Sequence, residues 1–263
     1  MAKLGVFGDS FAQSTPDESI NIVSWPYLVA KNLNLDVQNF ARAGTSVWYS
    51  CDNFLKNYKD FTHIIFVYTD QNRWPSLPKN LLEFSSVYDE SQLSNYPTIN
   101  ETGYATIKKL IEVHKYIFNE EFNQFVFQSV FDKVNELCRE NNIALVNILP
   151  FFNEEDVKKF NFDKMYGTCI TTVNKISQHE IYIEGKTVPK HKDLLFYVKN
   201  RDYRRNHINN ENNKRMAEIV KAEMHTTSPK IINAFAEPGF NYDAQLLLDY
   251  REHIMQNLKE NWK

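Results

Sequence analysis

The chain has 263 residues, of which 43% are hydrophobic and 14% aromatic, and its 30 basic and 33 acidic side chains give a formal net charge of −3. This length and apolar content are enough to build a core without disulfides or metal, and they exclude a wholly disordered chain. The near-neutral charge gives no electrostatic support for a nucleic-acid partner.

The first third of the chain alternates short apolar runs with helical spacing. The run at 4–7 ends at Gly8-Asp9-Ser10, and HIIFVY at 63–68 is long and apolar enough for a central strand covered on both faces. Ser24 is a candidate helix cap. In chain order we expect a strand at 4–7, a helix at 24–35, a strand at 36–40, a short helix at 53–58 and a strand at 63–68.

The rest of the chain is less regular. We expect helical pieces within 107–142, a strand at 143–149, a hairpin around Glu184-Gly185, a strand at 194–198 and a helix at 210–224. In domain terms we predict a domain at 1–225 with insertions near 74–106 and 153–192, a linker at 226–242 and an amphipathic C-terminal helix at 243–263.

Strands that alternate with helices predict an α/β fold with three layers, α/β/α, around a mostly parallel central sheet. In such sheets, ligands bind beyond the carboxyl ends of the strands. Polar clusters follow several of the expected strands at that end, so we look for the site there.

Four short motifs lie at those strand ends, and each has an ordinary structural role when taken alone. Ser10 in Gly8-Asp9-Ser10 suits a helix cap, Gly44 suits a turn, the segment 69–72 (Thr-Asp-Gln-Asn) suits a solvated loop, and His207 suits a surface loop. Their order and their common position at strand ends make the combination far more specific than any single member.

This combination resembles the SGNH, or GDSL-like, hydrolase family across roughly residues 3–220. The resemblance implies the flavodoxin-like SGNH architecture and a serine esterase that acts on small O-acyl or carbohydrate esters. It implies no metal and no organic cofactor.

The resemblance also implies a role for each motif. Ser10 is the expected nucleophile and His207 the general base. The amides of Ser10 and Gly44, with a side-chain carboxamide from Asn72 or Gln71, are the expected oxyanion hole.

The chain departs from the family pattern in two places. The third family motif begins with glycine, and Thr69 stands there instead. The family has aspartate three residues before the histidine, where this chain has Arg204, which cannot accept the imidazole N–H. Asp202 is the nearest carboxylate, and a backbone carbonyl or a dyad without an acid are the alternatives.

Those departures keep other functions open. One is a catalytically silent SGNH-fold module that binds glycan or serves as a structural part, and another is an O-acyltransferase that uses the same site. The closing helix at 243–263 leaves a homo-oligomer open as well.

Composition adds an expectation about where the protein resides. Cys51, Cys138 and Cys169 form no CxxC motif, which predicts isolated thiols in a reducing compartment. The N-terminal apolar stretch is too short for a signal peptide, and no window approaches a membrane span. We expect a cytoplasmic protein when synthesised, and the Asn- and Lys-rich composition leaves a viral source and association with a virion open.

Overall fold

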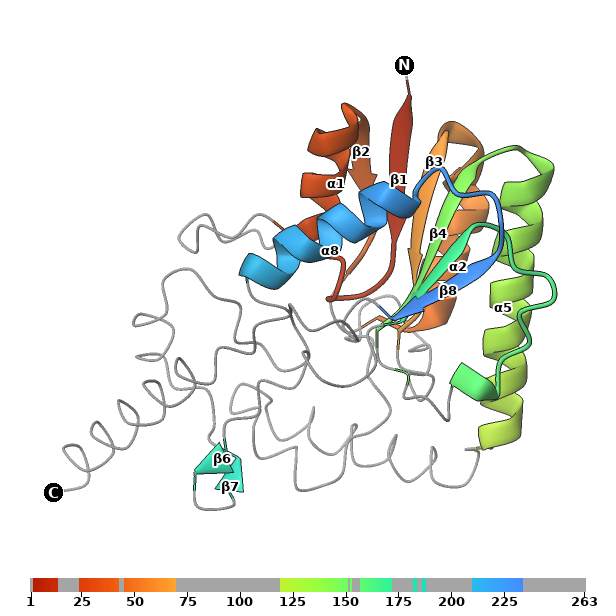
Figure 1. Ribbon diagram of the computed structural model, residues 1–263. Coiled ribbons are helices and arrows are strands. Elements are labelled where there is room, and N and C mark those ends of the chain that lie inside the picture. Colours follow the sequence, from red (N-terminus) through yellow and green to blue (C-terminus); the bar gives the residue numbers. More distant parts are fainter. Residues whose placement is uncertain are drawn as a thin grey trace, which may run out of the picture.

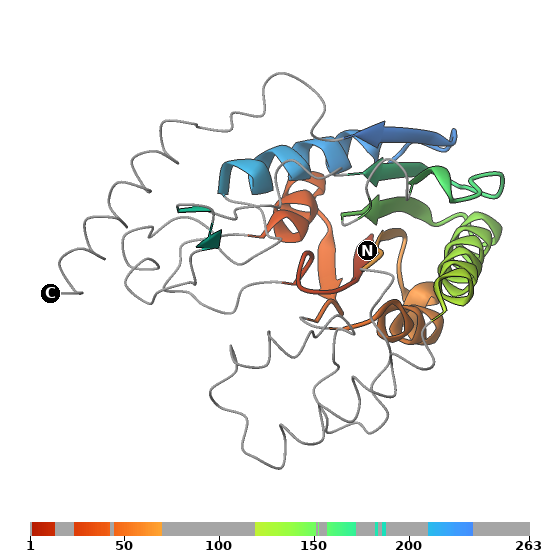
Figure 2. The same cartoon turned by 90° about the horizontal axis from the view of Figure 1, so that it is seen from below.

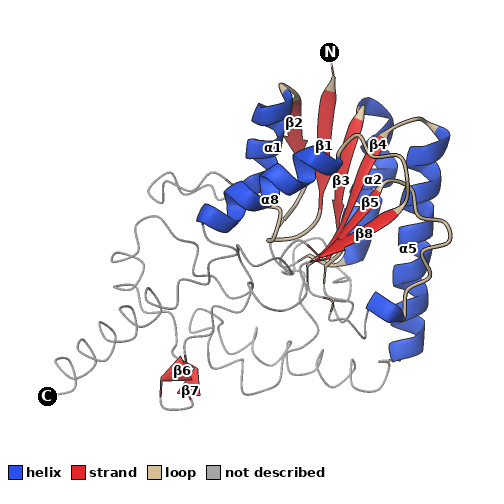
Figure 3. Ribbon diagram, viewed as in Figure 1, coloured by secondary structure: helices blue, strands red, loops and turns tan. Residues whose placement is uncertain are grey.

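The core of the computed structural model is a six-stranded sheet in which every neighbouring pair of strands is parallel (Figures 1 and 3). The structure describes residues 2–13, 24–42, 45–69, 119–150, 152, 157–171, 182–183, 186–187 and 210–233. In spatial order the strands are β2 (Asp36–Asn39), β1 (Lys3–Phe7), β3 (His63–Val67), β4 (Ala144–Leu149), β5 (Thr168–Thr171) and β8 (Lys230–Asn233).

Helices cover both faces of this sheet, so the expected three-layer α/β/α fold is confirmed. One face carries α1 (Trp25–Leu33) and α8 (Asn210–Glu223), and the other carries α2 (Val47–Asn57) and α5 (Glu120–Glu140), as Figure 2 shows. The 3-10 turn Tyr58–Asp60 follows α2. The strand order β2-β1-β3-β4-β5 is the flavodoxin-like order, and β8 extends it by one strand.

The central strands are apolar on both sides because both sides are covered. In β3, Ile65 and Val67 pack toward α1 and α8, whereas Ile64 and Phe66 pack toward α2 and α5, and all four are fully buried. A continuous apolar run is therefore what this position requires. It also leaves the strand ends as the places where polar side chains meet.

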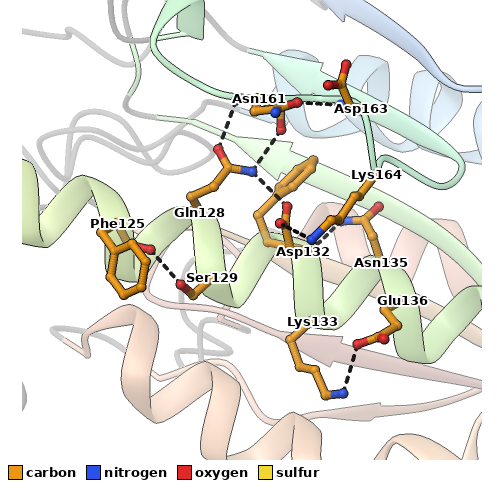
Figure 4. A network of polar contacts seen from close by, with 11 residues as sticks. Phe125, Gln128, Ser129, Asp132, Lys133, Asn135, Glu136, Asn161, Asp163 and Lys164 are labelled. Carbon is orange, nitrogen blue, oxygen red and sulfur yellow. Dashed lines mark hydrogen bonds and ion pairs between the residues drawn. The ribbon is translucent and has the colours of Figure 1, made fainter.

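Residues 157–167 lead back into the sheet, and α5 holds this segment by polar contacts (Figure 4). Gln128 forms a two-way pair with the backbone of Asn161, with both bonds at 2.8 Å. Asp132 pairs with Lys164 at 3.1 Å. Gly167 then takes a positive φ of 71° before β5 begins, and a Cβ there would lie 2.2 Å from the carbonyl oxygen of Leu145.

Several sequence expectations need correction. Helix α2 begins at Val47 and not at residue 53, because its buried stripe includes Ser50, a polar residue that hides the helical period. Strand β5 lies inside the range 153–192, which was expected to be an insertion. Strand β8 lies inside the range 226–242, which was expected to be a linker. Both strands are four residues long and bounded by polar residues, so neither shows a long apolar run.

Other expectations are confirmed. Tyr182–Ile183 pairs antiparallel with Lys186–Thr187, which is the hairpin predicted around residues 184 and 185. The three cysteines are free thiols, and burial raises the pKa of Cys138 and of Cys169. The strand expected at 194–198, the insertion at 74–106 and the helix at 243–263 lie outside the described residues.

None of the helices in the described part of the chain combines the length and the apolar character needed to cross a membrane.

Glu223 ties α8 to the amino ends of β5 and β8. Its carboxylate accepts the hydroxyl of Thr168 at 2.9 Å, the hydroxyl of Thr226 at 3.2 Å and the ammonium of Lys230 at 2.8 Å. Burial raises the pKa of Glu223, but the hydrogen bonds from Lys230 and Thr168 outweigh burial, and the net pKa lies below the ordinary value.

This shift makes the contribution of Glu223 to stability depend on pH. Because the native pKa is lowered, the stabilisation is present above the unfolded-state value of about 4.3 and is lost as the pH falls through the native value. We expect Glu223→Gln to lower the free energy of unfolding by about 1–3 kcal/mol at pH 7, with the difference from wild type shrinking below about pH 4. Urea unfolding at several pH values measures this. The control is Glu218→Gln, an exposed position on the same helix. A difference that stays constant from pH 7 to pH 3 would contradict the assignment.

Candidate functional site

The first polar motif lies at the point where the strand order reverses. The chain passes from β1 to β2 on one side and later pairs β3 on the other side of β1. In open parallel sheets, ligands bind at this switch point, beyond the carboxyl ends of the strands. Ser10 lies three residues after the end of β1, so the structure places the expected nucleophile at the position where this fold holds ligands.

Residues 9–13 form a single helical turn that Asp9 caps. The carbonyl oxygen of Asp9 accepts the amides of Ala12 at 3.1 Å and Gln13 at 3.0 Å, and its Oδ1 accepts the amide of Phe11 at 3.0 Å. This is the hydrogen bonding of a helix cap. The helix expected at 24–35 is α1, which begins at Trp25 after Ser24.

Side chains from distant elements hold the far end of this turn. The indole N–H of Trp25 donates to the carbonyl oxygen of Phe11 at 2.9 Å, and the side-chain amide of Asn39 donates to the carbonyl oxygen of Ala12 at 2.8 Å. Asn213 in turn accepts the backbone amide of Trp25 at 2.9 Å. Because His207 lies six residues before Asn213, the segment expected to supply the base continues into a helix that is bonded to α1, and α1 is bonded to the serine turn.

The loop after β2 is anchored on Gly8. The carbonyl oxygen of Gly8 accepts the amide of Arg42 at 3.1 Å and the hydroxyl of Thr45 at 3.4 Å. The Thr45 hydroxyl also donates to the carbonyl oxygen of Arg42 at 2.8 Å. Gly44 itself lies outside the described residues, but the residues at 42 and 45 that flank it are both bonded to the residue two before Ser10.

The end of β3 contacts the turn from the other side. The hydroxyl of Thr69 donates to Oδ2 of Asp9 at 2.8 Å. The phenol of the preceding residue, Tyr68, donates to the side chain of Asn147 at 3.0 Å, and Asn147 donates to Asn135 at 3.0 Å. Burial raises the pKa of Tyr68 well above its ordinary value, so the phenol stays a neutral donor.

Ser10 is more exposed than the residues directly before and after it in this turn. Gly8, Asp9, Phe11 and Ala12 are buried, whereas Ser10 is half-buried. The turn therefore presents Ser10 at the carboxyl edge of the sheet while its neighbours are packed inside.

Of the predicted site residues, the structure describes Ser10 alone. Five lie outside the described residues, and their roles stay predictions: Gly44, Gln71, Asn72, Asp202 and His207.

Sequence reasoning did not find the polar side chains that hold the turn. For Asn147, a signal existed, since an asparagine inside a buried apolar strand needs a hydrogen-bond partner. For Trp25, Asn39 and Thr69 the sequence held no such signal, because their partners are far away along the chain. Within the described ranges, no group of three or more His, Cys, Asp or Glu side chains is arranged to hold a metal ion.

No protein-family model matches the sequence, and no curated protein is significantly similar to it. Solved structures do match. A lipolytic protein of the G-D-S-L family from Desulfitobacterium hafniense is 13% identical with a TM-score of 0.43, and the match covers 84% of this chain and 99% of that chain.

Two further solved structures are similar. The psychrotrophic esterase EstA from a Pseudoalteromonas species is 11% identical with a TM-score of 0.39, covering 85% of this chain and 96% of its own. A GDSL-like lipase from Parabacteroides merdae is 10% identical with a TM-score of 0.43, covering 85% of this chain and 95% of its own. These likenesses concern the fold, so the chemistry has to be argued from the residues of this chain.

Gly8 provides a test of the turn itself. A Cβ at Gly8 would lie 2.7 Å from Cβ of Val67. We expect Gly8→Ala to push the turn away from β3, to cost about 1–3 kcal/mol of stability, and to speed amide hydrogen exchange in residues 8–13. Gly5→Ala is the control, because its Cβ, within β1, would lie 2.7 Å from the buried ring of Phe61 and would cause a comparable clash away from the turn. Equal exchange rates of residues 8–13 in both variants, measured by mass spectrometry, would argue against a special role for Gly8.

Proposed function

We propose that the protein is a serine esterase of the SGNH type that hydrolyses small O-acyl or carbohydrate esters. One observation carries the proposal. Ser10 is half-buried between Asp9 and Phe11, which are both buried, and their turn lies at the topological switch point. Hydrogen bonds to β2, β3 and α1 hold it there. A nucleophile needs this combination of access and fixed position.

In the proposed reaction His207 takes the proton of the Ser10 hydroxyl while the oxygen attacks the ester carbonyl. The tetrahedral intermediate collapses, and the leaving alcohol receives that proton from His207. Water, deprotonated by His207, then attacks the acyl-enzyme, and the carboxylic acid leaves while Ser10 regains its proton. Every bond formed and broken is accounted for by these two side chains and water.

The oxyanion would be held by the amides of Ser10 and Gly44, with a carboxamide from Asn72 or Gln71. The bonds from Arg42 and Thr45 to Gly8 support the part played by Gly44, because they tie both ends of its loop to the start of the serine turn.

Two alternatives use the same fold. An O-acyltransferase would pass the acyl group to an alcohol in place of water, with the same residues. A catalytically silent module that binds glycan or serves as a structural part is favoured by Arg204, which replaces the expected aspartate. Assembly of copies through 243–263 and association with a virion likewise stay predictions.

The nucleophile can be tested with a fluorophosphonate probe, which labels activated serines. We expect the wild-type protein to be labelled at Ser10, as mapped by mass spectrometry, and Ser10→Ala to lose the label with little change in Tm, because the half-buried hydroxyl contributes little to packing. Ser50→Ala is the control, since the buried Ser50 hydroxyl has no hydrogen-bond partner in the described structure. Labelling that persists in Ser10→Ala would remove Ser10 from the reaction.

The group that orients His207 can be tested separately. If Asp202 accepts the imidazole N–H, Asp202→Asn should favour the wrong tautomer and lower turnover of a p-nitrophenyl ester by up to about 10⁴-fold. Circular dichroism should remain unchanged. The control is Asp60→Asn, which lies after α2. A rate within about twofold of wild type would show that the site works as a Ser–His dyad.

A further inference from the structure

We infer that Thr69 is a positioning residue for Ser10 and that it acts through the buried carboxylate of Asp9. The inference rests on the proposed function and adds a residue specific to this chain. Thr69 stands where the SGNH pattern has glycine, so the hydroxyl it brings has no counterpart in that pattern.

The geometry links the two strands through one carboxylate. Oδ2 of Asp9 accepts the hydroxyl of Thr69 at 2.8 Å, and Oδ1 accepts the amide of Phe11 at 3.0 Å. Asp9 and Thr69 are both fully buried. Ser10 lies between Asp9 and Phe11, the two residues that this carboxylate joins, so the rotamer of Asp9 sets the path of the backbone through Ser10.

Thr69 is itself a fixed reference point. The residue before it, Tyr68, donates its backbone amide to Ile148 at 2.9 Å and its phenol to Asn147 at 3.0 Å. The end of β3 is thereby tied to β4. The hydrogen bond from the Thr69 hydroxyl therefore fixes Asp9 relative to β3 and β4, and Asp9 in turn fixes the backbone at Ser10.

A buried carboxylate oxygen that loses its donor is energetically unfavourable, because no water replaces the lost hydrogen bond, and this cost favours a different rotamer. The Asp9 side chain would then rotate, and the Phe11 amide and the backbone of Ser10 would shift with it. A displacement of about 1 Å at a nucleophile can slow its reaction about 100-fold.

The chain offers a closely matched control at the other end of the sheet. The hydroxyl of Thr168 donates to Glu223 at 2.9 Å, and Thr168 is as fully buried as Thr69. Thr168→Val thus removes the same kind of bond, a buried threonine hydroxyl to a carboxylate, at the amino edge of the sheet and away from Ser10.

The experiment measures the second-order rate constant for fluorophosphonate labelling of Ser10 in the full chain, at a temperature where circular dichroism shows each variant folded. We expect Thr69→Val to slow labelling about 10- to 100-fold, and Thr69→Ser to stay within about threefold of wild type because it keeps the hydroxyl. Thr168→Val should lower Tm but leave the labelling rate within about twofold of wild type. If Thr69→Val does not fold, Thr69→Ala replaces it with the same expected loss.

A second measurement tests the route through Asp9. In a double-mutant cycle, Asp9→Ala combined with Thr69→Val should be no slower than Asp9→Ala alone, because Asp9→Ala already removes the carboxylate that accepts the Thr69 hydroxyl. Multiplied effects would overturn the route through Asp9. Equal labelling of wild type and Thr69→Val, or equal slowing in Thr69→Val and Thr168→Val, would overturn the positioning role while leaving the esterase proposal intact. Absence of Ser10 labelling in the wild-type protein would overturn the proposed function, and the positioning role with it.

Discussion

Burial of both faces of the parallel sheet is the constraint on which the rest of the structure depends. Strand β3 is apolar at every position from Ile64 to Val67, because helices cover it on both sides. Polar chemistry is thereby confined to the strand ends. The carboxyl ends of β1, β2 and β3 share one edge, where Gly8 bonds Arg42 and Thr45, and Asp9 bonds Thr69.

The two edges of the sheet have different roles. At the amino edge, Glu223 accepts hydrogen bonds from Thr168, Thr226 and Lys230 and fastens α8 to β5 and β8. At the carboxyl edge, Asp9 gathers the Phe11 amide and the Thr69 hydroxyl beside a half-buried serine. The same physical device, a carboxylate that accepts several donors, stabilises the fold at one edge and shapes the candidate site at the other.

The serine turn is not a self-sufficient local motif. Its carbonyl oxygens accept donors from Trp25 and Asn39. The carbonyl oxygen of Gly8, just before the turn, accepts donors from Arg42 and Thr45, and the Asp9 carboxylate accepts the hydroxyl of Thr69. These partners lie in α1, in β2 and the loop after it, and directly after β3. The geometry around Ser10 therefore exists only when these elements are in place. The turn is short, but the hydrogen bonds that hold it come from widely separated parts of the fold.

The sequence by itself determined the strand runs 4–7, 63–68 and 143–149, the α/β class and the position of Ser10 at a strand end, because apolar runs and tight turns are local signals. The roles of His207, Asp202, Gly44 and the 71–72 carboxamides stay predictions from the motif pattern. Only the tertiary structure decided that β5 and β8 join the sheet, that α2 starts at Val47, and that Thr69 bonds Asp9. The physical reason is the same in each case, because the deciding partners are remote along the chain. They are the neighbouring strands for β5 and β8, the packing that buries Ser50 for α2, and a residue 60 positions away for the bond between Thr69 and Asp9.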